Sequence, residues 1–391
     1  MARRLPERGP PAKLPVMEQL FLNPRHGTPG VVVLTEGGFR RARAEIESWQ
    51  GYAPTPLHEL PWPGIGALFW KDESARFGLR SFKALGGAYA VMRALSAELA
   101  RRGAARAPDG KALESGELAE ETAEVTVTCA TDGNHGRSVA WGARRFGCRC
   151  VIFVHEHVSQ GRRDAIAAFG AEVREVKGNY DDSVREAQRV AEAENWLVIS
   201  DTSYPGYTEP PRDVMQGYRL MAAEALEAMG APPTHVFVPG GVGGVAAAVS
   251  VQLRASGARN ARLVIAEPDR AACLLESARA GEAVAVAGEL DTIMAGLACG
   301  EPSLLAWQEL ERGAFAFMAV PDDGVPAAMR RLRAEGIEAG ESAVAGLLAL
   351  EAALARPEWR DALGLDGASR VLVFGTEGAT DPALYERMTA N

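Results

Sequence analysis

The chain has 391 residues, of which 47% are hydrophobic and 24% are charged, so it is long enough for two domains or for one domain with a large insertion. Its formal net charge is -9 and no basic stripe stands out, which argues against nucleic acid as the main partner. No apolar run approaches the roughly 20 residues that span a bilayer, and the proline-rich residues 1–11 lack the apolar segment of a signal peptide. We therefore expect a cytoplasmic protein without a membrane partner.

The first third of the chain contains few clear elements. Residues up to about 31 form an extended lead-in, residues 67–70 are typical of a short strand, and a helix is expected from residue 88 to about residue 103. Residues 104–121 are polar and rich in turn-forming residues, so we expect an exposed loop or insertion there.

From residue 125 onward, short apolar strands alternate with helices. Such alternation is typical of βαβ units and predicts an α/β fold with a mostly parallel sheet. The expected strands are residues 125–128, 151–154, 172–176, 196–200, 235–238, 263–266 and 371–374, and the expected helices are residues 138–143, 161–169, 180–194 and 214–229.

The cysteines are scattered along the chain and odd in number, so we expect no disulfide framework. Cys148 and Cys150 flank the start of an expected strand, and His155 and His157 follow its end. Two thiolates alone do not make a zinc site, and no further set of ligands has a workable spacing. We therefore expect no bound metal.

A glycine-rich loop, residues 239–244, follows a buried strand and opens an alanine-rich helix. Glycines let the backbone come close to a ligand, and the free N–H groups at a helix N-terminus attract phosphate. A tight strand-to-helix turn or a dinucleotide site would look similar. The loop lies in mid-chain, however, and the acidic residue after the next strand, Glu267, is followed at once by Pro268, which argues against the dinucleotide site.

Two further stretches contain candidate catalytic residues. Lys83 lies between Phe82 and small residues, as a lysine must if its amine is to be desolvated and its pKa lowered for Schiff-base chemistry. An ordinary helix lysine with its stem on apolar surface would look the same. Residues 131–136 lie between a strand and a helix, where polar side chains either bind a ligand or cap the helix.

Taken together, these stretches resemble the fold-type II pyridoxal-phosphate enzymes, which include the tryptophan synthase β subunit, the threonine and serine dehydratases and cysteine synthase. The similarity starts near Thr55 and rests on four motifs that occur in the order of that group: 81–83, 131–136, 240–244 and 341–343. Within the group, residues 76–79, 130–137 and 376–381 resemble the ammonia-lyases that act on 2,3-diaminopropionate. An aspartate, Asp132, stands where the dehydratases usually have serine.

The resemblance implies two open, mostly parallel α/β domains with a cofactor cleft between them. Residues 1–83 and 203–391 would form the larger, cofactor-binding domain, and residues 84–202 a smaller inserted domain. The implied cofactor is pyridoxal 5'-phosphate, held by Lys83 and with its ring hydroxyl on Asn134. Its pyridine nitrogen would face Thr376 or, as second candidate, Glu341, and its phosphate would bind the glycine loop of Gly240, Gly241, Val242, Gly243 and Gly244.

The same resemblance implies elimination of the β-ammonia from D- and L-2,3-diaminopropionate, followed by hydrolysis of the aminoacrylate to pyruvate and a second ammonia. Lys83 and Asp132 would act as bases on opposite faces of the cofactor. Asp201 would bind the β-ammonium of the substrate or tune Asp132. The substrate would be bound by the loop that contains Thr131, Asp132, Gly133 and His135. A homodimer is implied as well. The alternatives are a serine or threonine dehydratase, another β-eliminating lyase, and a cofactor-binding module without activity.

Overall fold

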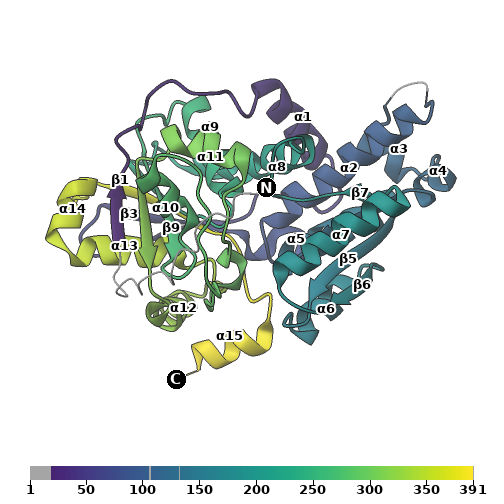
Figure 1. The fold of residues 1–391 in the computed structure, drawn as a ribbon. Helices are drawn as coiled ribbons and strands as arrows, with labels where there is room; N and C mark the ends of the chain where they lie inside the picture. Colours follow the sequence, from purple (N-terminus) through teal and green to yellow (C-terminus); the bar gives the residue numbers. More distant parts are fainter. Residues whose placement is uncertain (1–18, 105–106, 132, 391) are drawn as a thin grey trace, which may run out of the picture.

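The computed structural model describes residues 19–104, 107–131 and 133–390, and two sheets organise it (Figure 1). The larger sheet has the strand order β1-β10-β9-β8-β11-β3-β2. Strands β10, β9, β8, β11 and β3 pair in parallel, whereas β1 and β2 pair antiparallel at the two edges. These strands are β1 (Gln19–Leu22), β2 (Leu57–Leu60), β3 (Ala67–Asp72), β8 (His235–Pro239), β9 (Arg262–Pro268), β10 (Ala316–Val320) and β11 (Arg370–Gly375).

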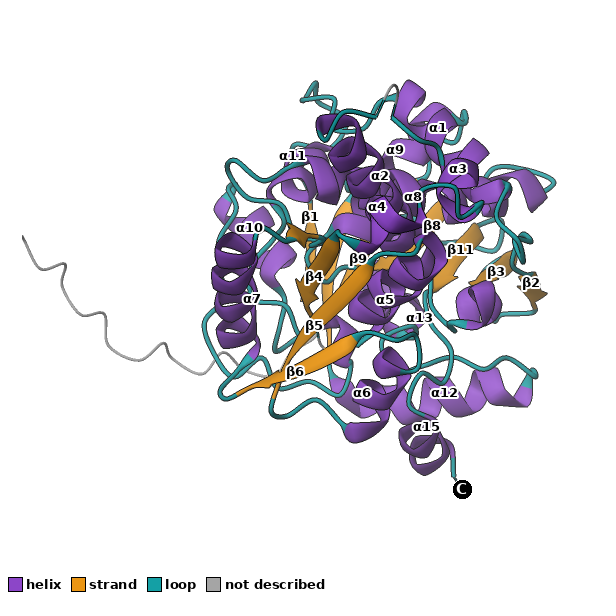
Figure 2. Cartoon of the chain, turned by 90° about the vertical axis from the view of Figure 1, so that its right-hand side faces the viewer, coloured by secondary structure: helices purple, strands orange, loops and turns teal. Residues whose placement is uncertain are grey.

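The smaller sheet has four parallel strands in the order β6-β5-β4-β7. They are β4 (Thr126–Ala130), β5 (Arg149–His155), β6 (Glu172–Val176) and β7 (Leu197–Val198). Figure 2 shows α5 (Asn134–Phe146) and α7 (Tyr180–Glu194) on opposite sides of this sheet. All four strands fall within residues 84–202, the range expected for an inserted domain, and the domain limits themselves stay a prediction.

Helices cover both sheets and connect their strands. Besides α5 and α7, the helices are α1 (Glu36–Glu47), α2 (Lys83–Arg101), α3 (Gly110–Glu114), α4 (Ala119–Ala123), α6 (Gln160–Ala167), α8 (Glu209–Ala228), α9 (Gly244–Ala255), α10 (Cys273–Ala280), α11 (Leu304–Gly313), α12 (Val325–Ala334), α13 (Ala345–Ala355), α14 (Pro357–Leu363) and α15 (Pro382–Thr389). Short 3₁₀ helices span Glu73–Gly78, Ala295–Leu297 and Asp322–Gly324.

Helix α2 lies at the junction of the two sheets, because it packs on α5 from the smaller sheet and on α8. Glycines make both contacts close. A Cβ on Gly86 would lie 2.6 Å from the Val214 carbonyl oxygen, and a Cβ on Gly142 would lie 2.7 Å from the Cα of Ala88. Only glycine fits at such distances, so the packing of α2 is fixed at its first turns, where Lys83 lies.

The predicted α/β class and the mostly parallel pairing are confirmed, and α7 spans the predicted residues 180–194. Three local predictions were incomplete. The extended lead-in contains β1, which pairs with β10, a strand that was not predicted. The polar segment at 104–121 is not only a loop, because Asp109 caps α3 and α4 follows. The helix expected from residue 88 begins at Lys83.

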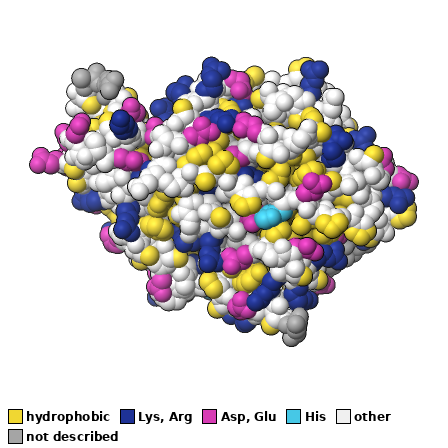
Figure 3. Space-filling view, turned by 180° about the vertical axis from the view of Figure 1, so that it is seen from behind, with side chains coloured by type: hydrophobic (Ala, Val, Ile, Leu, Met, Phe, Trp, Pro, Cys, Tyr) yellow, Lys and Arg dark blue, Asp and Glu magenta, His cyan; other side chains and the backbone are white. Residues whose placement is uncertain are grey.

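The surface carries both signs of charge. On the face shown in Figure 3, lysine and arginine side chains are interspersed with aspartate and glutamate. In the part of the chain that the structure describes, no helix combines the length and the apolar character needed to cross a membrane.

Candidate active site

Lys83 begins α2 directly after a strained turn. Phe77 and Arg80, which precede it, have φ angles of 49° and 55°, in the left-handed region that non-glycine residues rarely adopt. Such strain persists only where the surroundings fix the backbone. Here the Phe82 N–H donates to the Thr376 carbonyl oxygen (3.0 Å), and Ser81 forms a β-bridge with Glu377. The turn is therefore fastened to the segment after β11.

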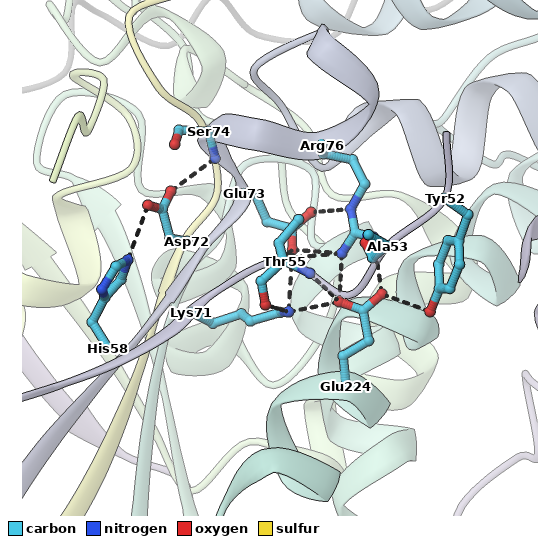
Figure 4. Close-up of polar contacts among 10 residues, drawn as sticks. All are labelled: Tyr52, Ala53, Thr55, His58, Lys71, Asp72, Glu73, Ser74, Arg76 and Glu224. Atoms are coloured by element: carbon cyan, nitrogen blue, oxygen red, sulfur yellow. Dashed lines mark hydrogen bonds and ion pairs between the residues drawn. The ribbon is translucent and has the colours of Figure 1, made fainter. Parts of the chain in front are cut away.

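Four buried charged residues fix the start of this turn: Lys71, Glu73, Arg76 and Glu224, which we call the support cluster (Figure 4). The Lys71 ammonium donates to Glu224 Oε2 (2.6 Å), and the Arg76 guanidinium donates to Glu73 (2.8 Å) and to Glu224 (2.6 Å). Burial alone would raise the pKa of Glu73, but Arg76 and Lys71 hold it below its ordinary value. With two cations and two anions, the cluster is internally balanced.

The Lys83 amino group pairs with Asp201, the second predicted catalytic residue. Lys83 Nζ lies 2.5 Å from Asp201 Oδ2, and His135 Nδ1 lies 3.7 Å from the same oxygen. His135 is held by its other ring nitrogen, which lies 2.7 Å from the Ile199 carbonyl oxygen. The structure thus brings together three of the predicted site residues, from α2, from the start of α5 and from the segment after β7.

The charge state of Lys83 differs from our expectation. Burial alone would lower the pKa of Lys83, as predicted, but the Asp201 carboxylate raises it overall. Burial likewise would raise the pKa of Asp201, but the Lys83 ammonium lowers it overall. The prediction of a lowered lysine pKa was therefore wrong for the protein alone, because a carboxylate 118 positions away in the sequence pairs with the amine.

The glycine loop lies beside this pair. It connects β8 to the N-terminus of α9, and Gly241 and Gly243 have φ angles of 58° and 95°, which favour glycine. A Cβ on Gly244 would lie 3.9 Å from the Asp201 carbonyl oxygen and 4.0 Å from the Tyr218 ring. The Val242 carbonyl oxygen accepts from the Ser303 N–H (2.9 Å), which holds the loop against the start of α11. Free N–H groups at a helix N-terminus are suited to a phosphate.

The predicted substrate loop is held by a side chain of its own. Thr131 Oγ1 accepts from the N–H groups of Gly133 and Gly136, each at 3.0 Å. Asn134 begins α5, and its amide donates to Glu377 Oε2 (2.5 Å). The loop and the end of β11 therefore meet at Asn134. The fourth predicted residue of this loop, Asp132, lies outside the described residues.

The two candidates for the pyridine nitrogen occupy different surroundings. Thr376 is buried and adjoins the Lys83 turn through its carbonyl oxygen. Glu341 lies 3.0 Å from Arg162 Nη2, which comes from α6 of the smaller sheet. Burial, together with the nearby Glu377 charge, raises the pKa of Glu341 to about 7. Glu341 is thus tied to a cation across the two sheets, whereas Thr376 lies next to the turn that carries Lys83.

These residues fit pyridoxal 5'-phosphate. A lysine lies close to a glycine loop at a helix N-terminus, as a cofactor with an aldehyde and a phosphate requires. Two buried polar atoms beside that lysine, His135 Nδ1 and the Tyr218 hydroxyl, have no hydrogen-bond partner within the described ranges. Unsatisfied buried polar atoms of this kind are uncommon in native proteins and point to a group that the site receives.

Sequence reasoning missed two residues of the site, Tyr218 and Glu377. Glu377 was quoted in a motif but given no role, although its carboxylate accepts from Asn134 and from the Ser342 N–H (3.2 Å). Tyr218 follows Gly217, which contacts α2 so closely that a Cβ would lie 2.4 Å from the Leu85 carbonyl oxygen. The local signal is a Gly-Tyr pair in a helix of mixed polar and apolar residues, and it is weak.

The fold and the site define a pyridoxal-phosphate enzyme. Residues 48–377 match the family described as pyridoxal-phosphate dependent enzymes, and the chain belongs to that family. The predicted fold type and cofactor are thereby confirmed.

Within the family, the chain is similar to diaminopropionate ammonia-lyases. It is 39% identical over 364 residues to the enzyme of that name from Escherichia coli strain K12, covering 89% of this chain and 90% of the relative. The crystal structure of holo diaminopropionate ammonia lyase from Escherichia coli matches with a TM-score of 0.87 and 35% identity, over 96% of this chain and 97% of the other. A complex of that enzyme with an aminoacrylate-PLP azomethine reaction intermediate matches with a TM-score of 0.85, at the same identity and coverage.

Proposed function

We propose that this protein is a pyridoxal-phosphate-dependent ammonia-lyase that converts 2,3-diaminopropionate, in both enantiomers, and one molecule of water to pyruvate and two molecules of ammonia. The observation that carries the proposal is the Lys83–Asp201 pair beside the glycine loop. In this pair, the lysine that anchors the cofactor lies next to a carboxylate. A carboxylate there suits a substrate that carries a second ammonium on Cβ. The similarity to enzymes named for this substrate supports the same conclusion.

Several residues would hold the cofactor. Lys83 would anchor it covalently, the loop from Gly240 to Gly244 would receive its phosphate, Asn134 would bind its ring hydroxyl, and Thr376, rather than Glu341, would serve its pyridine nitrogen. Thr376 is preferred because Glu341 already pairs with Arg162. When bound, the cofactor supplies the electron sink for the carbanion at Cα.

The remaining steps belong to side chains of the protein. Lys83 takes the α-proton from one face of the substrate, and Asp132 takes it from the other, so that both enantiomers react. Asp201 binds the β-ammonium, because its carboxylate is ionised and already holds one ammonium in the structure. The backbone from Thr131 to His135 receives the substrate carboxylate, and the first ammonia leaves from Cβ beside Asp201. Water then hydrolyses the released aminoacrylate to pyruvate and the second ammonia.

Turnover of the two enantiomers with cofactor spectra is the experiment that tests this proposal. The purified holoenzyme is expected to show a visible absorbance band that shifts on addition of either enantiomer while pyruvate accumulates. A band that shifts only with serine or threonine would move the assignment to a dehydratase. Absence of any band after addition of pyridoxal phosphate would exclude the proposed lyase activity.

The variant Asp132→Asn tests the two-base mechanism. We expect it to remove turnover of the D-isomer, by on the order of 10²-fold or more, and to spare the L-isomer, because only one face loses its base. Pyruvate release from each isomer measures this. Equal loss with both isomers would contradict the assignment of separate faces.

From the resemblance we further propose a cytoplasmic homodimer that acts in amino-acid catabolism, without a nucleic-acid partner. Residues 84–202 would form the smaller domain, which closes over the substrate and excludes water. Light scattering of the holoenzyme tests the dimer, and protection of this range from hydrogen exchange on substrate addition tests the closure.

A further inference from the structure

The Tyr218 hydroxyl lies beside the Lys83 amine without a partner. The tyrosine belongs to α8 and is 1% exposed. Within the described parts of the chain, its Oη has no hydrogen-bond partner. Leaving a buried hydroxyl unsatisfied lowers stability, and phenylalanine would fill the same space without that loss. The hydroxyl therefore needs an explanation other than packing.

The packing around Tyr218 places its ring at the cofactor lysine. Lys83 Nζ lies 5.7 Å from the centre of the Tyr218 ring and 5.4 Å from that of Phe82, so the amine sits over two aromatic rings. The two rings are 4.6 Å apart. On the other side, Gly86 leaves room for the phenol, because a Cβ there would lie 2.4 Å from Tyr218 Cε1.

Four titratable groups face the Lys83 amine: Asp201, Tyr218, His135 and Cys299. Asp201 accepts a hydrogen bond from this amine at 2.5 Å. Burial raises the pKa of Tyr218, so at neutral pH the phenol keeps its proton and its oxygen lone pairs. Burial lowers the pKa of His135, so this imidazole does not add a positive charge beside the amine. The phenol is therefore a neutral group that can accept a hydrogen bond from an ammonium.

We propose that Tyr218 is a positioning residue whose hydroxyl takes the hydrogen bond of the Lys83 amine when the β-ammonium of the substrate occupies Asp201. The inference rests on the proposed function, which gives Asp201 to the substrate. Lys83 has one charged partner in the structure, and the substrate competes for it. Without a second acceptor, the released amine would have no hydrogen bond to hold it at the atom whose proton it moves. The Tyr218 oxygen is a buried acceptor whose ring lies 5.7 Å from the Lys83 amine.

The pKa of Lys83 in the cofactor-free protein tests this directly. Labelling of Lys83 by trinitrobenzenesulfonate across a range of pH, read by mass spectrometry, reports that pKa. In the variant Asp201→Asn, the charged partner of Lys83 is gone, and we expect the amine to donate its hydrogen bond to the Tyr218 hydroxyl. Adding Tyr218→Phe in that background is expected to lower the apparent pKa by about one unit, since an acceptor that stabilised the ammonium is lost.

The matched control is Tyr89→Phe in the same background. Tyr89 is a buried tyrosine on the same helix as Lys83, and its charged neighbours are Asp213 and Arg93. It should leave the labelling curve unchanged. An identical curve with and without the Tyr218 hydroxyl would overturn the proposal. So would an equal shift from Tyr89→Phe.

The holoenzyme gives a second, independent measurement. Tyr218→Phe is expected to lower kcat about tenfold and to leave KM within about twofold, because it acts on a proton transfer and not on substrate binding. If the variants of Asp201 do not fold, the separate effects of Tyr218→Phe on kcat and on KM test the proposal. An unchanged kcat contradicts the proposal.

Two further outcomes separate a structural role and a failed function from the inference. If Tyr218 serves only packing, Tyr218→Phe raises Tm by about 1–3 °C and moves neither the labelling curve nor kcat. If the wild type releases no pyruvate from 2,3-diaminopropionate, the proposed function fails even when the labelling curve shifts. In that case we also withdraw the proposal that Lys83 changes its hydrogen-bond partner from Asp201 to Tyr218 when substrate binds.

Discussion

Two clusters of buried charge lie within a few residues of each other in this chain, and they differ in how completely they are satisfied. In the support cluster, Lys71 and Arg76 each donate to Glu224, and further bonds from Thr55 and Tyr52 occupy the two carboxylates. In the active-site cluster, which we define as Lys83, Asp201, His135 and Tyr218, two polar atoms have no hydrogen-bond partner among the described residues. A saturated network stabilises one geometry, whereas an unsaturated one is ready for a ligand.

The difference explains why the two clusters are neighbours. The unsaturated site costs stability, and the turn before Lys83 has two residues with left-handed backbone angles. The support cluster holds the first residue of that turn, Arg76, through guanidinium bonds to both Glu73 and Glu224. The rigid support cluster therefore holds the backbone of this strained turn in place, and the turn positions the reactive lysine.

Removal of Lys83 should have the largest effect on activity. We expect Lys83→Ala to lower pyruvate release from 2,3-diaminopropionate by on the order of 10⁴-fold or more, because the covalent anchor and a proton carrier are lost together. Lys111→Ala, which removes an exposed lysine of α3, is the control and should keep full activity. A Lys83→Ala enzyme that retained a tenth of the wild-type rate would exclude the assigned role.

Breaking the support cluster should act on stability instead. We expect Glu224→Gln to lower the free energy of unfolding by about 3–5 kcal/mol, because Lys71 and Arg76, both 1% exposed, lose a shared carboxylate. Denaturant unfolding of the cofactor-free protein measures this.

The control for this variant lies one helical turn further along α8. Glu227 pairs with Arg43 at the surface, and Glu227→Gln should cost no more than about 1 kcal/mol. If the two variants were equally stable, the support cluster would not be the structural element that we describe.

Much of the active site could be predicted from local sequence. The glycine loop and the 131–136 loop each lie next to a strand end that the pattern of apolar residues had located, and Lys83 lies just before the helix expected from residue 88. The glycine loop follows β8 and Thr376 follows the neighbouring strand β11, so these two motifs lie at one edge of the larger sheet, whereas the 131–136 loop follows β4 of the smaller sheet. Fold class and cofactor followed from the order of such motifs.

What could not be predicted depends on contacts between distant residues. The Lys83–Asp201 pair reverses the expected direction of the lysine pKa, and no local pattern reveals it. The support cluster needs Glu224, which is 153 positions from Lys71. Strands β1 and β2 are short edge strands whose pairing, rather than their composition, defines them. Tyr218 was missed because its role depends on one unsatisfied atom.

The smallest expected effect concerns Glu341, whose buried charge is satisfied less completely than those of the support cluster and more completely than those of the active-site cluster. It is buried with one cation, Arg162, and one anion, Glu377, near it. Its pKa is raised to about 7 in the folded protein, against an ordinary value of 4.5. Between these two pH values the folded state binds the extra proton, so this group stabilises the fold at low pH and loses that contribution as the pH rises toward 7.

We therefore expect the wild type, relative to Glu341→Gln, to lose at most about 3 kcal/mol of unfolding free energy between roughly pH 4.5 and 7. The comparison with the variant is essential because buried histidines such as His135, whose pKa is lowered by burial, titrate in the same range with the opposite sign. Urea unfolding of the cofactor-free proteins at several pH values measures the difference, and Glu227→Gln serves as the exposed control. A difference that stayed constant with pH would show that Arg162 keeps Glu341 ionised, and Glu341 would then belong with the saturated, structural charges of the support cluster.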